Sequence, residues 1–170
     1  SSENWPGIEN ANINFDMNAD GGRVTASIQK GALQINRILD DPRIPLEKLQ
    51  AAIKWQYQNN ELMVPEWQLS LSNADMTGDF KGSWKPSPLT SSLGILDLQG
   101  TVQQGDASRV HRYLPLSISP TVRHYVRDSV LKGSLQGVGV KIKGDLKQLP
   151  FANPKEGEFR FSGKVKEVQY

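Results

Sequence analysis

An alternation of apolar and polar residues decides the fold, and it is clearest in the stretch Ala51-Ala52-Ile53-Lys54-Trp55-Gln56-Tyr57. The odd-numbered positions of this stretch are apolar, whereas Lys54 and Gln56 between them are polar. Successive side chains of a β-strand point to opposite faces, so a strand with this sequence has one apolar and one polar face. The stretch therefore predicts a strand in a sheet that has one side in water.

The same period of two recurs on both sides of this stretch. The apolar members of the other runs are Ile13, Phe15 and Met17; Val24, Ala26 and Ile28; Trp67, Leu69 and Leu71; Phe80, Gly82 and Trp84; Leu96, Leu98 and Val102; Val138, Val140 and Ile142; and Phe159, Phe161 and Val165. We therefore predict a mainly β chain with about eight to ten strands in an antiparallel sheet.

Turn residues separate these runs. Asp20-Gly21-Gly22 predicts a hairpin loop, and three further turns are expected from composition, at Asn59-Asn60, Asn73-Ala74-Asp75 and Gln104-Gly105-Asp106. Proline cannot donate a hydrogen bond to a strand ladder. Pro42, Pro45 and Pro65 therefore restrict where central strands can lie.

Residues 106–132 break the pattern, because their apolar residues have helical spacing. Ser119 can cap a helix whose first position is Pro120, and Gly133 is placed to end it. Four apolar side chains share one stripe of this helix: Val122, Tyr125, Val126 and Val130. A shorter helix is expected from Asp106 to Tyr113. The sequence thus predicts a single β-rich segment over residues 1–170 with a helical insertion at about 106–132.

The predicted helices are too short to cover the predicted sheet. About eight to ten strands at ~4.8 Å spacing make a sheet roughly 40–50 Å wide. The best helix, of about 13 residues, is only ~20 Å long. Either the sheet folds over itself as a sandwich, or part of its apolar face stays open as a groove. Composition does not decide between these two arrangements.

Composition excludes several classes of protein. The chain has 170 residues, a net charge of +2 and no cysteine. So mild a charge gives no strong nucleic-acid footprint, and without cysteine there is no disulfide framework or thiolate metal site. No apolar run approaches the ~20 residues that a membrane-spanning helix needs. The sequence indicates no oligomeric state.

Candidate catalytic and metal sites are weak. His124 and Asp128 can meet on the predicted helix, but Ser129 points elsewhere, so a nucleophile and its base are not within reach. His111 and His124 match no common ligand spacing. Asn18-Ala19-Asp20-Gly21-Gly22 looks slightly like a calcium loop but lacks the later glutamate. We expect no enzyme, no metal and no cofactor.

A family resemblance rests on a series of residues that runs to the C-terminus. They are Pro45-Leu46, Leu49 and Trp55, then Leu96-Asp97-Leu98, Asp106, Tyr113-Leu114-Pro115, Gly133, Lys143-Gly144-Asp145-Leu146, Leu149-Pro150-Phe151, Gly157, Phe159 and Tyr170. In this order and spacing they resemble the YhdP family, which comprises very large AsmA-like envelope proteins of Gram-negative bacteria. The family continues past the final tyrosine, so the resemblance implies that this chain is an internal fragment of a longer, repeat-like one.

The resemblance implies a long, twisted antiparallel sheet curled into a U-shaped groove. It implies a periplasmic segment of an inner-membrane-anchored protein, which contacts membranes through other parts of the full-length chain. The implied activity is phospholipid passage between inner and outer membranes, which supports the outer-membrane barrier. The partner is then phospholipid, and nucleic acid is not expected.

The candidate groove lining consists of the apolar members of the predicted strands. They are Trp55, Tyr57, Trp67, Leu69, Leu71, Phe80, Trp84, Leu96, Leu98, Val140, Ile142, Phe159 and Phe161. Arg123 and Arg127 share a face of the predicted helix and are candidates for contact with a headgroup or a partner. The competing interpretation for each lining residue is a filled sandwich core, since such residues are routinely buried. Which of them line a groove depends on strand register, because a one-residue slip inverts every face.

Two other function classes stay open. Four tryptophans on a β-rich chain also permit a carbohydrate-binding sandwich, for which Trp5 and Trp67 are candidate platforms. A purely structural scaffold segment without a ligand is the third class. A scaffold would lose its fold when charges are placed on the apolar lining, whereas a conduit could stay folded and stop conducting.

Overall fold

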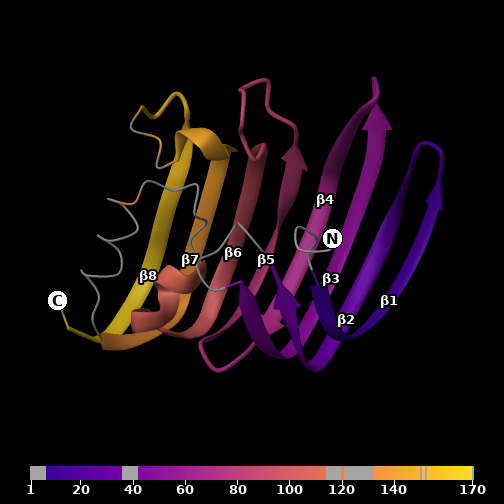
Figure 1. The fold of residues 1–170 in the computed structure, drawn as a ribbon. Coiled ribbons are helices and arrows are strands. Elements are labelled where there is room, and N and C mark those ends of the chain that lie inside the picture. The colour runs from indigo at the N-terminus through magenta and orange to yellow at the C-terminus, as the bar shows by residue number, and fades with distance from the viewer. Residues whose placement is uncertain are drawn as a thin grey trace.

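A computed structural model describes residues 7–35, 42–113, 120, 132–149, 151 and 153–169. Eight strands form one antiparallel sheet in the order of the sequence, from β1 to β8 (Figure 1). The strands are β1 Gly7–Asn18, β2 Gly21–Gln34, β3 Arg43–Gln58, β4 Glu61–Ser72, β5 Met76–Lys85, β6 Ile95–Asp106, β7 Lys132–Asp145 and β8 Gly157–Gln169. The predicted mainly β antiparallel sheet is confirmed, and within the described residues it is a single sheet and not two packed layers.

Three of the predicted turns are confirmed, at the β1–β2, β3–β4 and β4–β5 connections. At the β4–β5 turn, Asn73 Oδ1 accepts hydrogen bonds from the backbone N–H groups of Asp75 and Met76. At the β1–β2 hairpin, Asn18 Oδ1 accepts hydrogen bonds from the backbone N–H groups of Asp20 and Gly21. At the β3–β4 hairpin, Asn59 and Asn60 have φ angles of 52° and 63°. Asparagine tolerates this left-handed region, which suits the right-handed twist of a hairpin.

The turn predicted at Gln104-Gly105-Asp106 is wrong, because β6 runs through it to Asp106. Gly105 pairs with Met76 on β5 and with Leu135 on β7. β7 continues past this point to Lys132, and the Asp106 backbone N–H donates a hydrogen bond to the Asp75 carbonyl oxygen just before β5 begins, so hydrogen bonds on both sides hold the turn-like composition extended. At this point β6 has one residue more than β5, and a register shift between Thr77 and Gly78 accommodates it.

Two of the prolines lie inside strands, at places that spare the ladders. Pro65 lies where the β4–β5 register shifts, between Val64 and Trp67. Pro45 pairs with Ala32 on β2, and it lies beyond Lys48, where the β3–β4 ladder ends. Both positions agree with the confinement of strand proline to bulges and unpaired edges.

The helical interval between β6 and β7 begins as a 3₁₀ helix, η2, at Ala107–Tyr113. Asp106 starts it, since its Oδ1 accepts hydrogen bonds from the Ser108 backbone N–H and hydroxyl. In the longer predicted helix Pro120 is helical, and the other residues up to 131 lie outside the described part. The expectation that Gly133 ends that helix is wrong, because β7 begins at Lys132 and already contains Gly133. A second short 3₁₀ helix, η3, spans Leu146–Gln148.

The strand register aligns the alternating runs across the whole sheet. One row of cross-strand partners reads Phe15, Val24, Ile53, Trp67, Gly82, Leu98, Ile142 and Phe159. The row of their sequence neighbours reads Asn14, Thr25, Ala52, Gln68, Lys81, Gln99, Lys141 and Arg160. Because side chains alternate along a strand, these rows define an apolar face and a polar face of the sheet.

Fully buried hydrophobic side chains are few. One cluster, Ile28, Leu46 and Leu49, holds β2 to β3. A second cluster, Leu149 and Phe151, packs against Ile142, Leu146 and Phe159 near the β7–β8 connection. The greater part of the apolar face between these clusters is not a closed core.

Candidate functional site

The candidate site is the apolar face, and the register places the predicted lining residues on it together. Trp67, Leu98, Ile142 and Phe159 belong to the row that crosses all eight strands. The next row on one side contains Leu69, Phe80, Val140 and Phe161, and the row beyond it contains Leu71. On the other side of the first row, Trp84 and Leu96 are partners in one row. Trp55 is the partner of Gly22, and Tyr57 pairs with Leu62 beyond a register shift. The side chain of Phe161 lies outside the described part.

The exposure of these side chains differs from that of a filled core. Tyr57 is 52% exposed. Every other predicted lining residue whose side chain is described is half-buried, and none falls in the buried class. A side chain inside two interlocked layers would be buried, so the described residues do not form the filled sandwich core that was the simplest competing interpretation.

Five further residues extend the apolar face across β1 to β3. They are Ile13, Phe15, Met17, Val24 and Ile53, which are cross-strand partners or lie two positions apart on one strand. Phe15 and Met17 are the most exposed large hydrophobic residues described, at 68% and 61%. The sequence signal for them was the same alternation. Only the register shows that these strands share a face with Trp67 and Leu98.

Glycines on this face make room for aromatic rings from neighbouring strands. A Cβ built at Gly22 would lie 2.6 Å from Trp55 Cζ2, and one at Gly82 would lie 3.1 Å from Trp67 Cζ2. At Gly100 the added atom would lie 2.5 Å from Phe80 Cδ1. The aromatic rings therefore occupy the space that cross-strand glycines leave open, and a side chain at these glycines would displace them.

A polar network fixes the start of the helical interval to one end of the sheet. The Tyr113 hydroxyl donates to Asp75 Oδ2 and accepts from Asn73 Nδ2, both at 3.0 Å. Arg112 lies 3.6 Å from the same carboxylate. Burial, with the hydrogen bond to Asp75, raises the pKa of Tyr113 from 10.0 to about 12. The tyrosine of the Tyr-Leu-Pro motif is thus a structural anchor between η2 and the β4–β5 turn.

A second polar network lies at the opposite end of the strands. The buried Asp145 carboxylate accepts hydrogen bonds from the Ser87 and Ser92 hydroxyls and from the Lys147 backbone N–H. Burial alone would raise the pKa of Asp145, but these hydrogen bonds outweigh it and lower the pKa. The carboxylate therefore stays charged and ties the β5–β6 connection to the end of β7.

Several candidate residues lie outside the part that the structure describes. Arg123, Arg127, His124, Asp128 and Ser129 belong to residues 121–131, and the side chain of His111 is also outside it. The loop that resembles a calcium site uses its Asn18 oxygen on backbone N–H groups. Among the described residues there is no cluster of His, Asp or Glu that could hold a metal ion. No helix in the described ranges is both long and apolar enough to span a bilayer.

Comparison with known proteins assigns this chain to a family. A search of the curated proteins found no match, and a search of the solved structures also found none. The sequence model of one protein family, described as YhdP protein, matches residues 1–170, which is the whole chain. The match includes the Tyr113 and Asp145 anchors as well as the strands of the apolar face. The chain therefore belongs to the YhdP family.

Proposed function

We propose that this chain is a segment of a lipid-transport protein whose apolar face shields phospholipid acyl chains on their way between the inner and outer membranes. One observation carries the proposal, namely the row of apolar residues and glycine that runs unbroken from Phe15 on β1 to Phe159 on β8. A filled core would not leave Phe15 and Met17 more than half exposed. A surface that carries hydrocarbon would.

The energetics of lipid transfer favour a continuous apolar surface. Exposing one methylene to water costs about 0.8 kcal/mol, so a 16-carbon chain costs roughly 13 kcal/mol. A surface that replaces water along the path removes most of this barrier. Because the chain leaves one hydrocarbon environment for another, net binding is expected to be weak and without direction. The headgroup can remain in water, so no charged pocket on this face is needed.

The proposed shape is a sheet curled into a U-shaped groove with the apolar face inside. The resemblance supports this curvature, and the strand order makes β1 and β8 the two edges of such a groove. In this arrangement the protein is periplasmic and is anchored in the inner membrane by other parts of the full-length chain. It contributes to outer-membrane integrity through transfer alone, without a catalytic step.

The test uses two neighbouring residues that face opposite ways. Phe15→Asp places a charge on the apolar face at a side chain that is already 68% exposed, so folding should survive. Asn14→Asp adds the same charge on the polar face, one residue away. Native mass spectrometry of the purified chain should detect bound phospholipid in the wild type and in Asn14→Asp, and much less in Phe15→Asp. Equal lipid occupancy in both folded variants would contradict the proposal.

The same experiment separates the remaining function classes. A scaffold segment would carry no phospholipid in any variant. A carbohydrate-binding module would show glycan binding that depends on the tryptophans, and three of these, Trp55, Trp67 and Trp84, lie half-buried on the apolar face. Glycan binding that disappears with Trp67→Ala, together with no bound lipid, would favour that class.

A further inference from the structure

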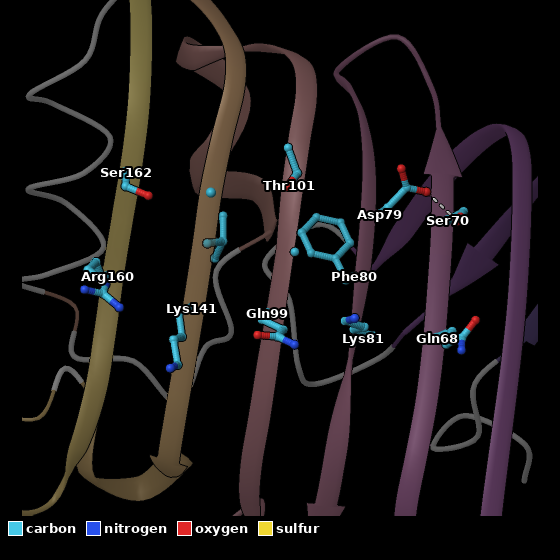
Figure 2. Close-up of a pocket in the computed structure, with 13 residues that line it drawn as sticks. Gln68, Ser70, Asp79, Phe80, Lys81, Gln99, Thr101, Lys141, Arg160 and Ser162 are labelled. Carbon is cyan, nitrogen blue, oxygen red and sulfur yellow. Dashed lines mark hydrogen bonds between the residues drawn. The ribbon is translucent and has the colours of Figure 1, made fainter.

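The polar face carries a hollow that the lipid proposal does not use. It has a volume of about 800 Å³ and is lined from β4 to β8 (Figure 2). Gln68, Lys81, Gln99, Lys141 and Arg160, which are consecutive cross-strand partners, form one row of its lining. Ser70, Asp79, Thr101 and Ser162 line the same hollow one row further on. The hollow is therefore built by the same register that builds the apolar face, on the opposite side of the sheet.

Cationic side chains dominate the charge of the hollow. Lys81, Lys141 and Arg160 line it together with the single carboxylate of Asp79, so three positive charges and one negative charge leave +2. Neighbouring strands are about 4.8 Å apart, so Lys81 and Lys141 lie about 10 Å apart at their backbones and Lys141 and Arg160 about 5 Å apart. The side chain of Lys81 has no hydrogen-bond or ion-pair partner among the described residues.

The carboxylates near these cations already have partners of their own, so they do not fully neutralise the cations. Asp79 accepts hydrogen bonds from the Ser70 hydroxyl and from Gln103 Nε2. Glu158, beside the hollow, lies 2.7 Å from Arg160 and 3.5 Å from Lys141. One carboxylate thus serves two cations, and the Arg160 side chain is still 62% exposed.

Neutral hydrogen-bonding groups occupy the space between the charges. Gln99 lies between Lys81 and Lys141 in the row, and Gln68 extends the row on the other side of Lys81. Thr101 and Ser162 add hydroxyl groups in the neighbouring row. Amides and hydroxyls both donate and accept, so they suit a ligand that carries hydroxyl groups of its own.

We propose that this hollow binds an acidic oligosaccharide laid across strands β4 to β8. Because Lys81 lies about 10 Å from Lys141 at the backbone, a single small anion cannot reach all three cations, whereas an extended ligand with repeated carboxylates can. Its hydroxyl groups would meet Gln68, Gln99, Thr101 and Ser162, and its carboxylates would meet Lys81, Lys141 and Arg160. Phe80 also lines the hollow (Figure 2), although its register position belongs to the apolar face.

The test is calorimetric titration of the 170-residue chain with tetragalacturonate at low salt. Lys81→Gln and Arg160→Gln should each weaken binding about threefold, as expected for exposed ion pairs. The double variant should weaken it about tenfold. Glu158→Gln should strengthen binding, because it frees Lys141 and Arg160. Lys48→Gln, on the same polar face but outside the hollow, should leave the affinity unchanged.

Further titrations and a lipid measurement separate this inference from its alternatives. Neutral maltotetraose and inorganic phosphate should bind far more weakly than tetragalacturonate. Phosphate binding of equal strength would show a site for single anions and overturn the proposal, as would an equal loss in Lys48→Gln or no binding of tetragalacturonate. Bound phospholipid should be the same in Lys81→Gln as in wild type, because the two sites lie on opposite faces.

Discussion

The ring of Phe80 on β5 lies directly against Gly100 on β6. A Cβ at Gly100 would stand 2.5 Å from Phe80 Cδ1 and 2.3 Å from the carbonyl oxygen of Asp79. The backbone on one side and the ring on the other leave the added atom no room. We therefore expect Gly100→Ala to destabilise the protein by about 1–3 kcal/mol, the usual cost of overpacking, as measured by urea unfolding.

Gly139→Ala is the matched control for this prediction. Its Cβ would meet the Ser162 hydroxyl oxygen at 2.9 Å, which is the end of a rotatable side chain, and otherwise only the Ser162 carbonyl oxygen at 3.6 Å. The cost at Gly139 should therefore be well below that at Gly100. Equal losses at both positions would mean that the contact between Phe80 and Gly100 does not govern packing on the apolar face.

Removing the Tyr113 hydroxyl tests the anchor of η2. Tyr113→Phe loses the hydrogen bonds to Asp75 and Asn73, so we expect a loss of about 1 kcal/mol in unfolding free energy near neutral pH. The folded state favours the neutral phenol, since its pKa is raised from 10.0 to about 12. Its contribution is therefore complete below pH 10 and is lost as the pH rises toward 12.

The measurement for Tyr113 is the difference in stability between wild type and Tyr113→Phe as a function of pH. The difference should shrink as the pH rises from 10.0 to about 12, because the wild type alone loses the contribution. Absorbance at high pH should show one tyrosine that ionises later in the wild type and is missing from the variant. A difference that stays constant over this range would show that the hydroxyl is not held by this network.

Asp145 gives a prediction with the opposite dependence on pH. Its folded-state pKa is lowered, so its contribution to stability is present above the pKa of the unfolded chain and is lost as the pH falls through the folded-state value. Asp145→Asn should cost about 2 kcal/mol at pH 7 in urea unfolding, because the half-buried hydroxyls of Ser87 and Ser92 lose a charged acceptor. The cost should diminish in acid. A cost that is the same in acid and at neutral pH would contradict the assigned role of the charge.

The sheet could be predicted from the sequence because each strand carries its own alternation. The runs around Ile13, Ile53 and Leu98 each indicate a strand, and asparagine and glycine mark most of the turns between them. The error at Gln104-Gly105-Asp106 has a physical cause, since turn composition was overruled by pairing with β5 on one side and β7 on the other. A local signal cannot report such a non-local ladder.

The candidate site could be predicted only in part. Trp67 and Leu98 were expected on an apolar face, but joining Phe15 and Ile53 to the same face required the register, which the sequence leaves open to slips of one residue. The hollow around Lys81 and Arg160 left no recognisable signal, because short pieces of five strands form it and only the register brings them together. On a strand with one face in water, the polar positions look alike in the sequence until their cross-strand partners are known.

Photo-crosslinking in cells shows which face of the sheet phospholipid touches, with reactive side chains placed at Leu98, Ile142, Gln99 and Lys141. Leu98 and Ile142 are partners on the apolar face, and Gln99 and Lys141 are partners on the polar face, one residue further along β6 and one residue back along β7. We predict phospholipid adducts at Leu98 and Ile142 and none at Gln99 and Lys141. Adducts absent from both apolar positions, while a known lipid channel gives them under the same conditions, would contradict the account.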